Sequence, residues 1–352
     1  MELGHEVHIL TVERGADGES GGVVEDDDGL FIHRLGARMP FGAPFNPLAT
    51  SKATNLIEDL DPDVVHVHAG IVCPFAYGTA KSAMARGVPV AITWHSMLDR
   101  SLRLLRPWAR LTGWPGAPIA LSAVSQVAAA HVARVFGGPV SILHDGVDQG
   151  VWSPSDSIPP ALPPLRCVAA SRLVPKKGMA ALLEAVTAAV DDLPHGALTL
   201  DIFGDGPDRW RIEQKVRQRR LDDVVAVRGR VTRSQLLAAY RESHVFCAPA
   251  RREAFGIAGL EARTAGLVIL GRPGNGLDEF VSSGLDSVLV DHPRDMARAL
   301  VRMATDHAWF ESLRAGAREA IPEFGYGLVA EQTMDEYRRA VAVRAGASAS
   351  TS

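Results

Sequence analysis

Two glutamates, Glu253 and Glu261, bracket a glycine-containing turn in the stretch REAFGIAGLEARTAG (residues 252–266). The apolar run HVFCAPA before it predicts a buried strand, and the pattern after it predicts a helix that starts near Phe255. A helix start offers free backbone N–H groups to an anion, and Gly256 lets a ligand approach closely. Glu261 lies too deep in the helix to cap it. Its carboxylate can accept hydrogen bonds from a ribose, and Glu253 can do the same for a second polyol, so the pattern suits a sugar–diphosphate–nucleoside.

Basic residues and glycine turns follow other predicted strands of the second half. They are Arg172 and Lys177 in SRLVPKKG, Gly204 in GDGPD, and Arg230 and Val231 in VRGRVTR. In doubly wound α/β sheets, ligands bind beyond the carboxyl ends of the strands, so we expect these residues on one rim. Convergent cations and glycine turns are the chemistry of a phosphate site.

Each of these signals also has a simpler explanation. Glu253 can be a first-turn carboxylate favoured by the helix dipole, and Arg172 and Lys177 can be solvated surface residues. The GDG turn lacks the third glycine of a dinucleotide fingerprint. A fifth element, GRPGNGLDE (271–279), follows the next predicted strand. Five such elements in consistent order at strand ends favour one common site over five unrelated features.

The length and the alternation of strands with helices predict two domains. A chain of 352 residues exceeds what one hydrophobic core usually supports. Short β-branched runs alternate with amphipathic segments on both sides of the proline-rich stretch SPSDSIPPALPPL, which has the composition of a stiff linker. We therefore predict an α/β fold with two doubly wound Rossmann-like domains, residues 1–152 and 166–325, joined by a linker at 153–165.

Composition excludes several classes of protein. A formal net charge of −4 does not indicate a nucleic-acid-binding protein, and we expect no nucleic-acid partner. Cys73, Cys167 and Cys247 match no metal-ligand spacing, and we expect reduced, structural thiols in a reducing compartment. No apolar run reaches the roughly 18 residues of a membrane span, and the first residues lack the pattern of a signal peptide. The sequence predicts a cytoplasmic protein.

The motifs together resemble the retaining glycosyltransferases of family 4, which have the GT-B arrangement of two Rossmann-like domains. The Glu-x7-Glu element with its Phe-Gly-Ile core is the most specific of them. The matching segments run in family order across nearly the whole chain: HVHAG (66–70), PVAITWHS (89–96), AVSQVAAAHVARVFGGPVSILHDGVD (123–148), SRLVPKKG (171–178), IFGDGPD (202–208), VRGRVTRSQL (227–236), REAFGIAGLEARTAG and GNGLDEFV (274–281).

The resemblance implies an acceptor-side first domain and a nucleotide-sugar-binding second domain, with a last helix, about 326–345, crossing back to the first. Arg172 and Lys177 would neutralise the donor diphosphate. The remaining implied contacts are the backbone of Phe255, Gly256 and Ile257 with the distal phosphate, Glu261 with the ribose, Glu253 with the transferred sugar, Arg230 and Val231 with the base, and His95 with the sugar and acceptor. Without the family, a histidine that ends an apolar strand such as His95 is more often structural.

The implied reaction is hexosyl transfer with retention at the anomeric carbon. The family has no settled enzyme nucleophile, and the usual proposal is same-face attack in which the leaving diphosphate takes the acceptor proton. Arg172, Lys177 and the helix start would stabilise the charge that grows on the leaving group. We expect no cofactor and no metal site, since the sequence holds no suitably placed Asp-x-Asp. Closure about the linker would assemble the site.

The chain departs from the family pattern in three places. Chains of the family begin with a strand, a glycine-rich loop and a helix. That helix ends in a GHEV stretch like Gly4 to Val7 of this chain. The resemblance therefore implies a first domain that lacks its first strand and that loop. We interpret this as a misassigned start; a fragment and a protein that has lost activity are the alternatives. The usual Pro-Asn-Gly-Val-Asp turn reads HDGVD, with His144 and Asp145, and Val268 stands where proline is common.

Donor and acceptor are less specified than the class of reaction. The ITWHS segment resembles mannosyltransferases that use GDP-mannose, and a UDP-sugar is the other candidate. A glycan, a lipid or a small molecule can be the acceptor. The segment DRSLRLLRPWARLTGW (99–114) interleaves arginines with leucines and tryptophans. It predicts either peripheral contact with the inner membrane surface or a core-packing helix with a basic outer face. The competing functions are a nucleotide-sugar epimerase of the same architecture and a non-catalytic nucleotide-sugar binder.

Overall fold

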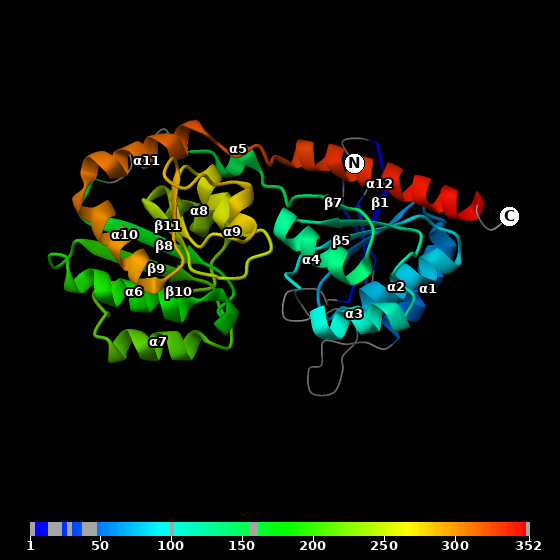
Figure 1. Ribbon diagram of the computed structural model, residues 1–352, viewed down its shortest axis with the longest axis horizontal. Coiled ribbons are helices and arrows are strands. Elements are labelled where there is room, and N and C mark those ends of the chain that lie inside the picture. Colours follow the sequence, from blue (N-terminus) through cyan, green and yellow to red (C-terminus); the bar gives the residue numbers. More distant parts are fainter. Residues whose placement is uncertain are drawn as a thin grey trace.

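The structure, a computed structural model, describes residues 4–12, 23–26, 30–36, 48–98, 102–154 and 161–349. Two α/β domains lie side by side along the long axis of the molecule (Figure 1). This confirms the predicted fold class of two Rossmann-like domains. Two parts of the sequence-based expectations, 99–101 of the arginine-rich segment and 155–160 of the linker, lie outside the described residues.

The second domain is built on a six-stranded parallel sheet in the order β10-β9-β8-β11-β12-β13. All six strands coincide with apolar runs of the sequence. The strands are β8 (Leu165–Ala170), β9 (Leu198–Phe203), β10 (Val225–Gly229), β11 (Val245–Ala248), β12 (Val268–Gly271) and β13 (Ser287–Leu289). The helices are η2 (Pro175–Lys177), α6 (Met179–Asp191), α7 (Arg209–Gln218), α8 (Arg233–Arg241), α9 (Ile257–Thr264), η3 (Gly276–Glu279), α10 (Pro293–Thr305) and α11 (His307–Glu319).

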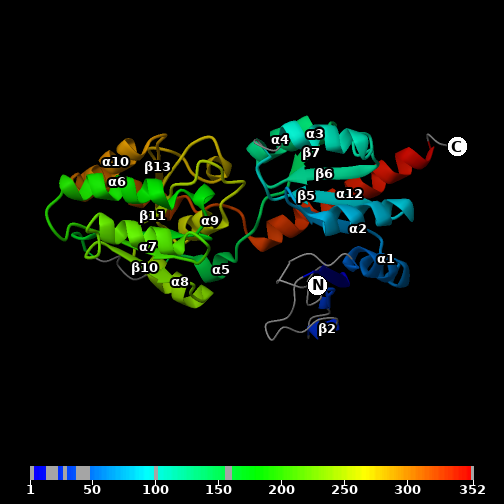
Figure 2. The same cartoon turned by 90° about the horizontal axis from the view of Figure 1, so that it is seen from below.

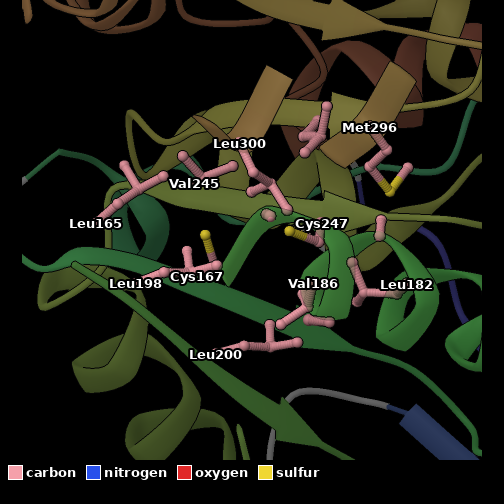
Figure 3. Close-up of a cluster of buried hydrophobic side chains, with 14 of the residues drawn as sticks. Leu165, Cys167, Leu182, Val186, Leu198, Leu200, Val245, Cys247, Met296 and Leu300 are labelled. Carbon is pink, nitrogen blue, oxygen red and sulfur yellow. The ribbon is translucent and has the colours of Figure 1, made fainter. Parts of the chain in front are cut away.

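The core of this domain explains why its strands are apolar on both faces. Figure 3 shows Cys167 and Cys247, from neighbouring strands, among leucine and valine side chains of the sheet and of helices α6 and α10. Both cysteines are free and buried, where a thiol packs as a small hydrophobic group. The opposite face packs around Phe246, Phe255 and Ile269, so helices and loops cover both sides of the sheet.

The described strands of the first domain form two sheets. β4 (Val65–Ala69), β5 (Val90–Trp94), β6 (Ile119–Ala123) and β7 (Val140–Ile142) make a parallel sheet in chain order. β1 (Val7–Thr11), β3 (Leu30–Arg34) and β2 (Val23–Asp26) make a separate one, in which β2 is antiparallel. The sequence did not predict β2, because two of the four residues in VVED are acidic and the run is too short to show a period. The helices are α1 (Ala49–Leu60), α2 (Pro74–Ala85), α3 (Leu102–Leu111) and α4 (Gln126–Phe136).

Two segments connect the domains. α5 (Gln149–Trp152) leads from the first domain to the second, and α12 (Tyr326–Ala349) returns and packs across β5 and β6 (Figures 1 and 2). Close approach of α12 is possible because Ala91, Ala120 and Ala340 meet at the contact with small side chains. Ser141 Oγ donates a hydrogen bond to Glu336 on the same helix, at 2.6 Å. The C-terminal helix is therefore structurally part of the first domain.

Candidate active site

The residues predicted to bind a diphosphate lie at the topological switch point of the second sheet. The chain runs outward from β8 through β9 to β10 and then returns to β11, on the other side of β8. The loops after β8 and β11 therefore leave the sheet side by side, as at the ligand sites of open α/β sheets. Lys177 from the first loop and Glu253 from the second form an ion pair, with Nζ 2.5 Å from Oε2. Their side chains are 23% and 20% exposed, so the pair is screened only in part.

The GDG turn after β9 serves the packing of two loops. Ser171 N–H donates to the Phe203 carbonyl at 3.1 Å, and Leu173 N–H donates to Asp205 at 2.9 Å. A Cβ at Gly204 would lie 1.9 Å from the Ser171 carbonyl oxygen, so only glycine allows this approach. The turn holds the loop that carries Arg172, whose side chain is exposed at the rim.

The helix after Glu253 begins later than the sequence suggested. α9 starts at Ile257, with Gly256 as its N-cap at φ 96°, whereas we expected a start near Phe255. The difference has a physical reason: the Phe255 side chain is buried against Phe280 and Phe324 and anchors the turn before the helix. Gly256 adopts a left-handed conformation with no side-chain cap, so the first amides of α9 have no partner within the helix. Ile257 is half exposed.

Glu261 lies one turn further along α9 and is partly buried. Burial raises its pKa to about 7, and the nearby Arg233 opposes this rise without cancelling it. Ligand groups that donate hydrogen bonds to this carboxylate would stabilise its ionised form. Arg233 was not singled out from the sequence. It opens α8 behind a capping box, and its guanidinium lies 5.3 Å from the ring centre of Trp152 in the connecting segment α5.

The turn after β10 carries the two residues expected near the base. Arg230 is exposed and Val231 is half buried, directly before the Thr232 cap of α8. None of the described contacts joins either side chain to Glu261. Their role as the lining of a base site stays a prediction.

In the first domain, His95 directly follows β5 and both of its ring nitrogens are engaged. Nδ1 lies 3.2 Å from Oδ1 of Asp145, and Nε2 lies 2.8 Å from Nδ1 of His68. The sequence pointed to the segments HVHAG and HDGVD but assigned no role to these two partners. Their signal was a position near the carboxyl end of a strand, on β4 and β7 of the same parallel sheet.

The domain interface brings in Glu279 of η3, which ends the strand-end segment 271–279 and to which the sequence assigned no role. Its carboxylate accepts the Gln126 N–H at the start of α4, at 2.7 Å, and lies 3.1 Å from His144 Nε2. Val124, directly after β6, packs in the same cluster as Phe255. The carboxyl edge of the first parallel sheet therefore faces the second domain.

The structure thus brings Lys177 and Glu253 together and places His95 on the facing domain. Among the described residues, no contact joins His95 to that pair, and no three His, Cys, Asp or Glu side chains are arranged to hold a metal ion. The assignment of all these residues to a site and the expected independence of metal stay predictions.

Two facing Rossmann-like domains, with a candidate phosphate site on one and a histidine-bearing sheet edge on the other, define the GT-B class of fold. Comparison with family models agrees on both halves. Residues 1–150 match the model described as Glycosyltransferase Family 4, and residues 164–306 match the one described as Glycosyl transferases group 1. Both halves of the chain are therefore similar to glycosyltransferases, the first half to family 4 and the second to group 1.

Curated relatives and solved structures are similar over most of the chain. The chain is 29% identical to a D-inositol 3-phosphate glycosyltransferase of Streptomyces bingchenggensis over 67% of its length, and the match spans 56% of that relative. It is 24% identical to alpha-maltose-1-phosphate synthase of Mycobacterium tuberculosis, over 88% of the chain and 91% of the relative.

Solved structures share the fold. Sucrose-phosphate synthase from Thermosynechococcus elongatus superposes with a TM-score of 0.77 at 20% identity, over 97% of this chain and 90% of that one. Anabaena HepE in complex with UDP and glucose gives a TM-score of 0.69 at 16% identity, over 87% and 86%.

Proposed function

We propose that the chain is a retaining, metal-independent glycosyltransferase that moves a hexose from a nucleoside-diphosphate sugar to a hydroxyl acceptor. The observation that carries the proposal is the Lys177–Glu253 pair at the switch point, beside the Gly256 turn that starts α9. One cation, one carboxylate and the first amides of α9 meet there. The cation and the amides complement the diphosphate of such a donor, and the carboxylate complements its hydroxyls.

The proposed roles follow from the positions. Arg172 and Lys177 neutralise the charge that develops on the leaving diphosphate, while the first amides of α9 bind its distal phosphate. Glu261 accepts hydrogen bonds from the ribose, and Glu253 accepts them from the transferred sugar. The facing edge of the first domain, with His95, receives the acceptor.

The donor and acceptor are the finer part of the proposal. The ITWHS segment favours GDP-mannose, but none of the relatives described above is named as a mannosyltransferase. The first relative is named for inositol 3-phosphate, and the HepE structure holds UDP, so a UDP-sugar and a phosphorylated polyol enter the proposal as candidates. Product analysis separates transfer from epimerisation, and binding without turnover identifies a non-catalytic binder.

Calorimetric titration of the purified chain with GDP, UDP and ADP tests the proposal directly. We expect one nucleotide to bind well above the others. Because hydrogen bonds to a charged group are worth about 1.5–3 kcal/mol, Glu261→Ala should weaken that binding by about 10- to 100-fold. The matched control is Glu184→Ala, an exposed helical glutamate of the same domain, which should leave the affinity unchanged. Absence of binding to all three nucleotides contradicts the proposal.

The affinity for the nucleotide should depend on pH through Glu261. Its pKa is about 7 in the free protein, and ribose hydroxyls bind the ionised form, so affinity should fall as pH drops below 7 and level off above it. In the limit the fall approaches about tenfold per pH unit. The terminal phosphate of the nucleotide, with a pKa of about 6, titrates in the same range. Glu261→Gln separates the two effects, since it should keep only the dependence that comes from the ligand; an unchanged profile in this variant contradicts the role of Glu261.

The outer face of α3 supports peripheral contact with a membrane and, with it, a lipid acceptor. Its exposed side chains include three arginines and two leucines, and the leucines are 79% and 88% exposed. None of the described helices is long and apolar enough to span a bilayer. In a sedimentation assay at low salt, we expect the protein to bind vesicles that contain anionic lipid and not neutral ones. Leu104→Ser combined with Leu111→Ser should abolish binding, because insertion needs the apolar groups as well as the charge. Vesicles that sediment without the wild-type protein contradict the membrane contact.

A further inference from the structure

Three side chains from three strand ends of the first domain form one continuous line. Asp145 follows β7, His95 follows β5, and His68 lies near the end of β4. The distances are 3.2 Å between Asp145 Oδ1 and His95 Nδ1, and 2.8 Å between His95 Nε2 and His68 Nδ1. The His68 side chain is exposed, and its Nε2 has no partner among the described residues. The line therefore starts at a carboxylate and ends at the imidazole of an exposed residue.

The positions of the protons follow from the chemistry of the two ends. The Asp145 carboxylate, 3.2 Å from Nδ1 of His95, favours a proton on that nitrogen, which leaves a lone pair on Nε2 of His95. That lone pair accepts the proton of His68 Nδ1. In neutral His68, Nε2 is then unprotonated and can accept a proton.

The groups around this line keep it in that state. The ring of His66 from β4 lies tilted beside that of His68, with centroids 4.4 Å apart, and its own nitrogens are satisfied by Thr93 and by Tyr337 of α12. Burial and the neighbouring histidines lower the pKa of His66 to about 3, so it stays neutral. His144, next to Asp145, turns toward Glu279 instead.

We propose that His68 is a catalytic residue that takes up the proton of the acceptor hydroxyl, with His95 and Asp145 as the positioning residues behind it. This rests on the proposed transferase function. The acceptor oxygen forms a bond to the anomeric carbon, and the bond from that carbon to the phosphate oxygen breaks with its electron pair on the nucleoside diphosphate. The acceptor proton passes to Nε2 of His68, in place of the transfer to the leaving diphosphate that the family resemblance implied, and the Nδ1 proton of His68 passes to Nε2 of His95. The resulting imidazolium lies beside the Asp145 carboxylate, which stabilises it.

The position of His95 supports this order. A histidine with both ring nitrogens engaged presents none to a substrate unless one contact breaks, whereas His68 presents Nε2 with the line intact. The carboxylate is a particular feature of this chain, since the turn HDGVD has Asp145 where the family pattern has asparagine. Asp145→Asn should therefore preserve the turn while it removes the charge.

Two measurements test the relay, and the first needs no substrate. In long-range 1H–15N spectra of protein labelled at histidine nitrogens, we expect the proton on Nδ1 of both His68 and His95. In Asp145→Asn, the amide can donate to His95 Nδ1, so the proton should move to Nε2 in both rings. His68→Gln and His95→Gln assign the signals. A wild-type His68 that carries its proton on Nε2 overturns the proposal.

The second measurement is the pH profile of nucleotide-sugar hydrolysis, in which water stands in for the acceptor. With UDP-glucose and GDP-mannose as probes, His68→Gln and Asp145→Asn should lose about 10²-fold or more of the rate, the usual range for general base catalysis. Their nucleotide affinity should be unchanged, and His68→Gln should lose the acidic limb of the profile. The control is His195→Gln, a histidine of the second domain.

The two proposals fail differently. A His68→Gln variant with the wild-type rate and profile overturns the relay, while nucleotide binding leaves the transferase function standing. A chain that binds no nucleotide contradicts the transferase function, and the catalytic role of His68 falls with it whatever the tautomers are.

Discussion

Replacing Arg263 with methionine should lower the free energy of unfolding of the second domain by about 3–5 kcal/mol, the usual cost of breaking a buried ion pair from one side. Arg263 is fully buried on α9, and Nη2 lies 2.9 Å from Oδ2 of Asp286, which is itself 5% exposed. The same guanidinium donates to the carbonyls of Gly316, Ala317 and Ala320 at the end of α11. Methionine has a similar length and helix propensity. The variant therefore isolates the loss of the charged donors, and urea unfolding measures it.

A matched arginine on the surface provides the control. Arg298 pairs with Asp295 on α10, and its side chain is 82% exposed. Arg298→Met should change the free energy of unfolding by less than about 0.5 kcal/mol, because exposed ion pairs contribute little. In the Arg263→Met background, Asp286→Asn should recover part of the loss, since it removes the uncompensated charge. A loss below about 1 kcal/mol for Arg263→Met contradicts the account, because an unpaired buried carboxylate costs several times that.

Arg263 also illustrates what the sequence could not show. It stands in the most specific motif, two residues after Glu261, yet the structure places its side chain in the protein interior. Nothing in the spacing distinguishes a buried arginine from a solvated one, because its partners come from residues 286 and 316–320. The sequence alone does not show which distant segments pack against a given face of α9.

The second sheet was predictable because each of its strands is a separate apolar run. Parallel strands covered on both faces leave an unbroken local signal, and the rule that ligands bind beyond their carboxyl ends then identifies the rim. This located the loops of Arg172, Lys177 and Glu253 in one place, and the Lys177–Glu253 contact across 76 positions agrees with that expectation.

The carboxyl edge of the first parallel sheet was less predictable, because its polar residues have a candidate role only in contact with one another. His68 and Asp145 acquire a candidate role only through contact with His95, and each of them alone is an ordinary polar residue at a strand end. Glu279 likewise acquires one only when the domains meet. Strand order within the sheet decides these contacts, and it is a property of the whole fold.

Removing the charge of Lys177 should have the largest effect on the proposed reaction. In the structure, Lys177 is held by Glu253, so its Nζ is already fixed at the switch point before a donor binds. A hydrogen-bonding cation that is already in place stabilises the charge that develops on the leaving group without reorganisation. Loss of one such group costs about 10²- to 10³-fold in rate. We expect Lys177→Met to lower kcat/KM for the nucleotide sugar by that factor, measured by release of the nucleoside diphosphate. Lys177→Arg should not restore full activity, because the guanidinium has a different donor geometry and length.

The neighbouring lysine distinguishes position from charge. Lys176 is exposed in the same 3-10 turn and carries the same charge, but no described contact involves its side chain. If diffuse positive charge were enough to attract the donor, Lys176→Met would lower the rate as much as Lys177→Met, and both effects would shrink at high salt as the charges are screened. If instead the ion pair with Glu253 fixes the position of the cation, only Lys177→Met should lower the rate severely. That loss of rate should persist at high salt. Equal defects in the two variants would therefore contradict the site described above, even in a protein that transfers sugar.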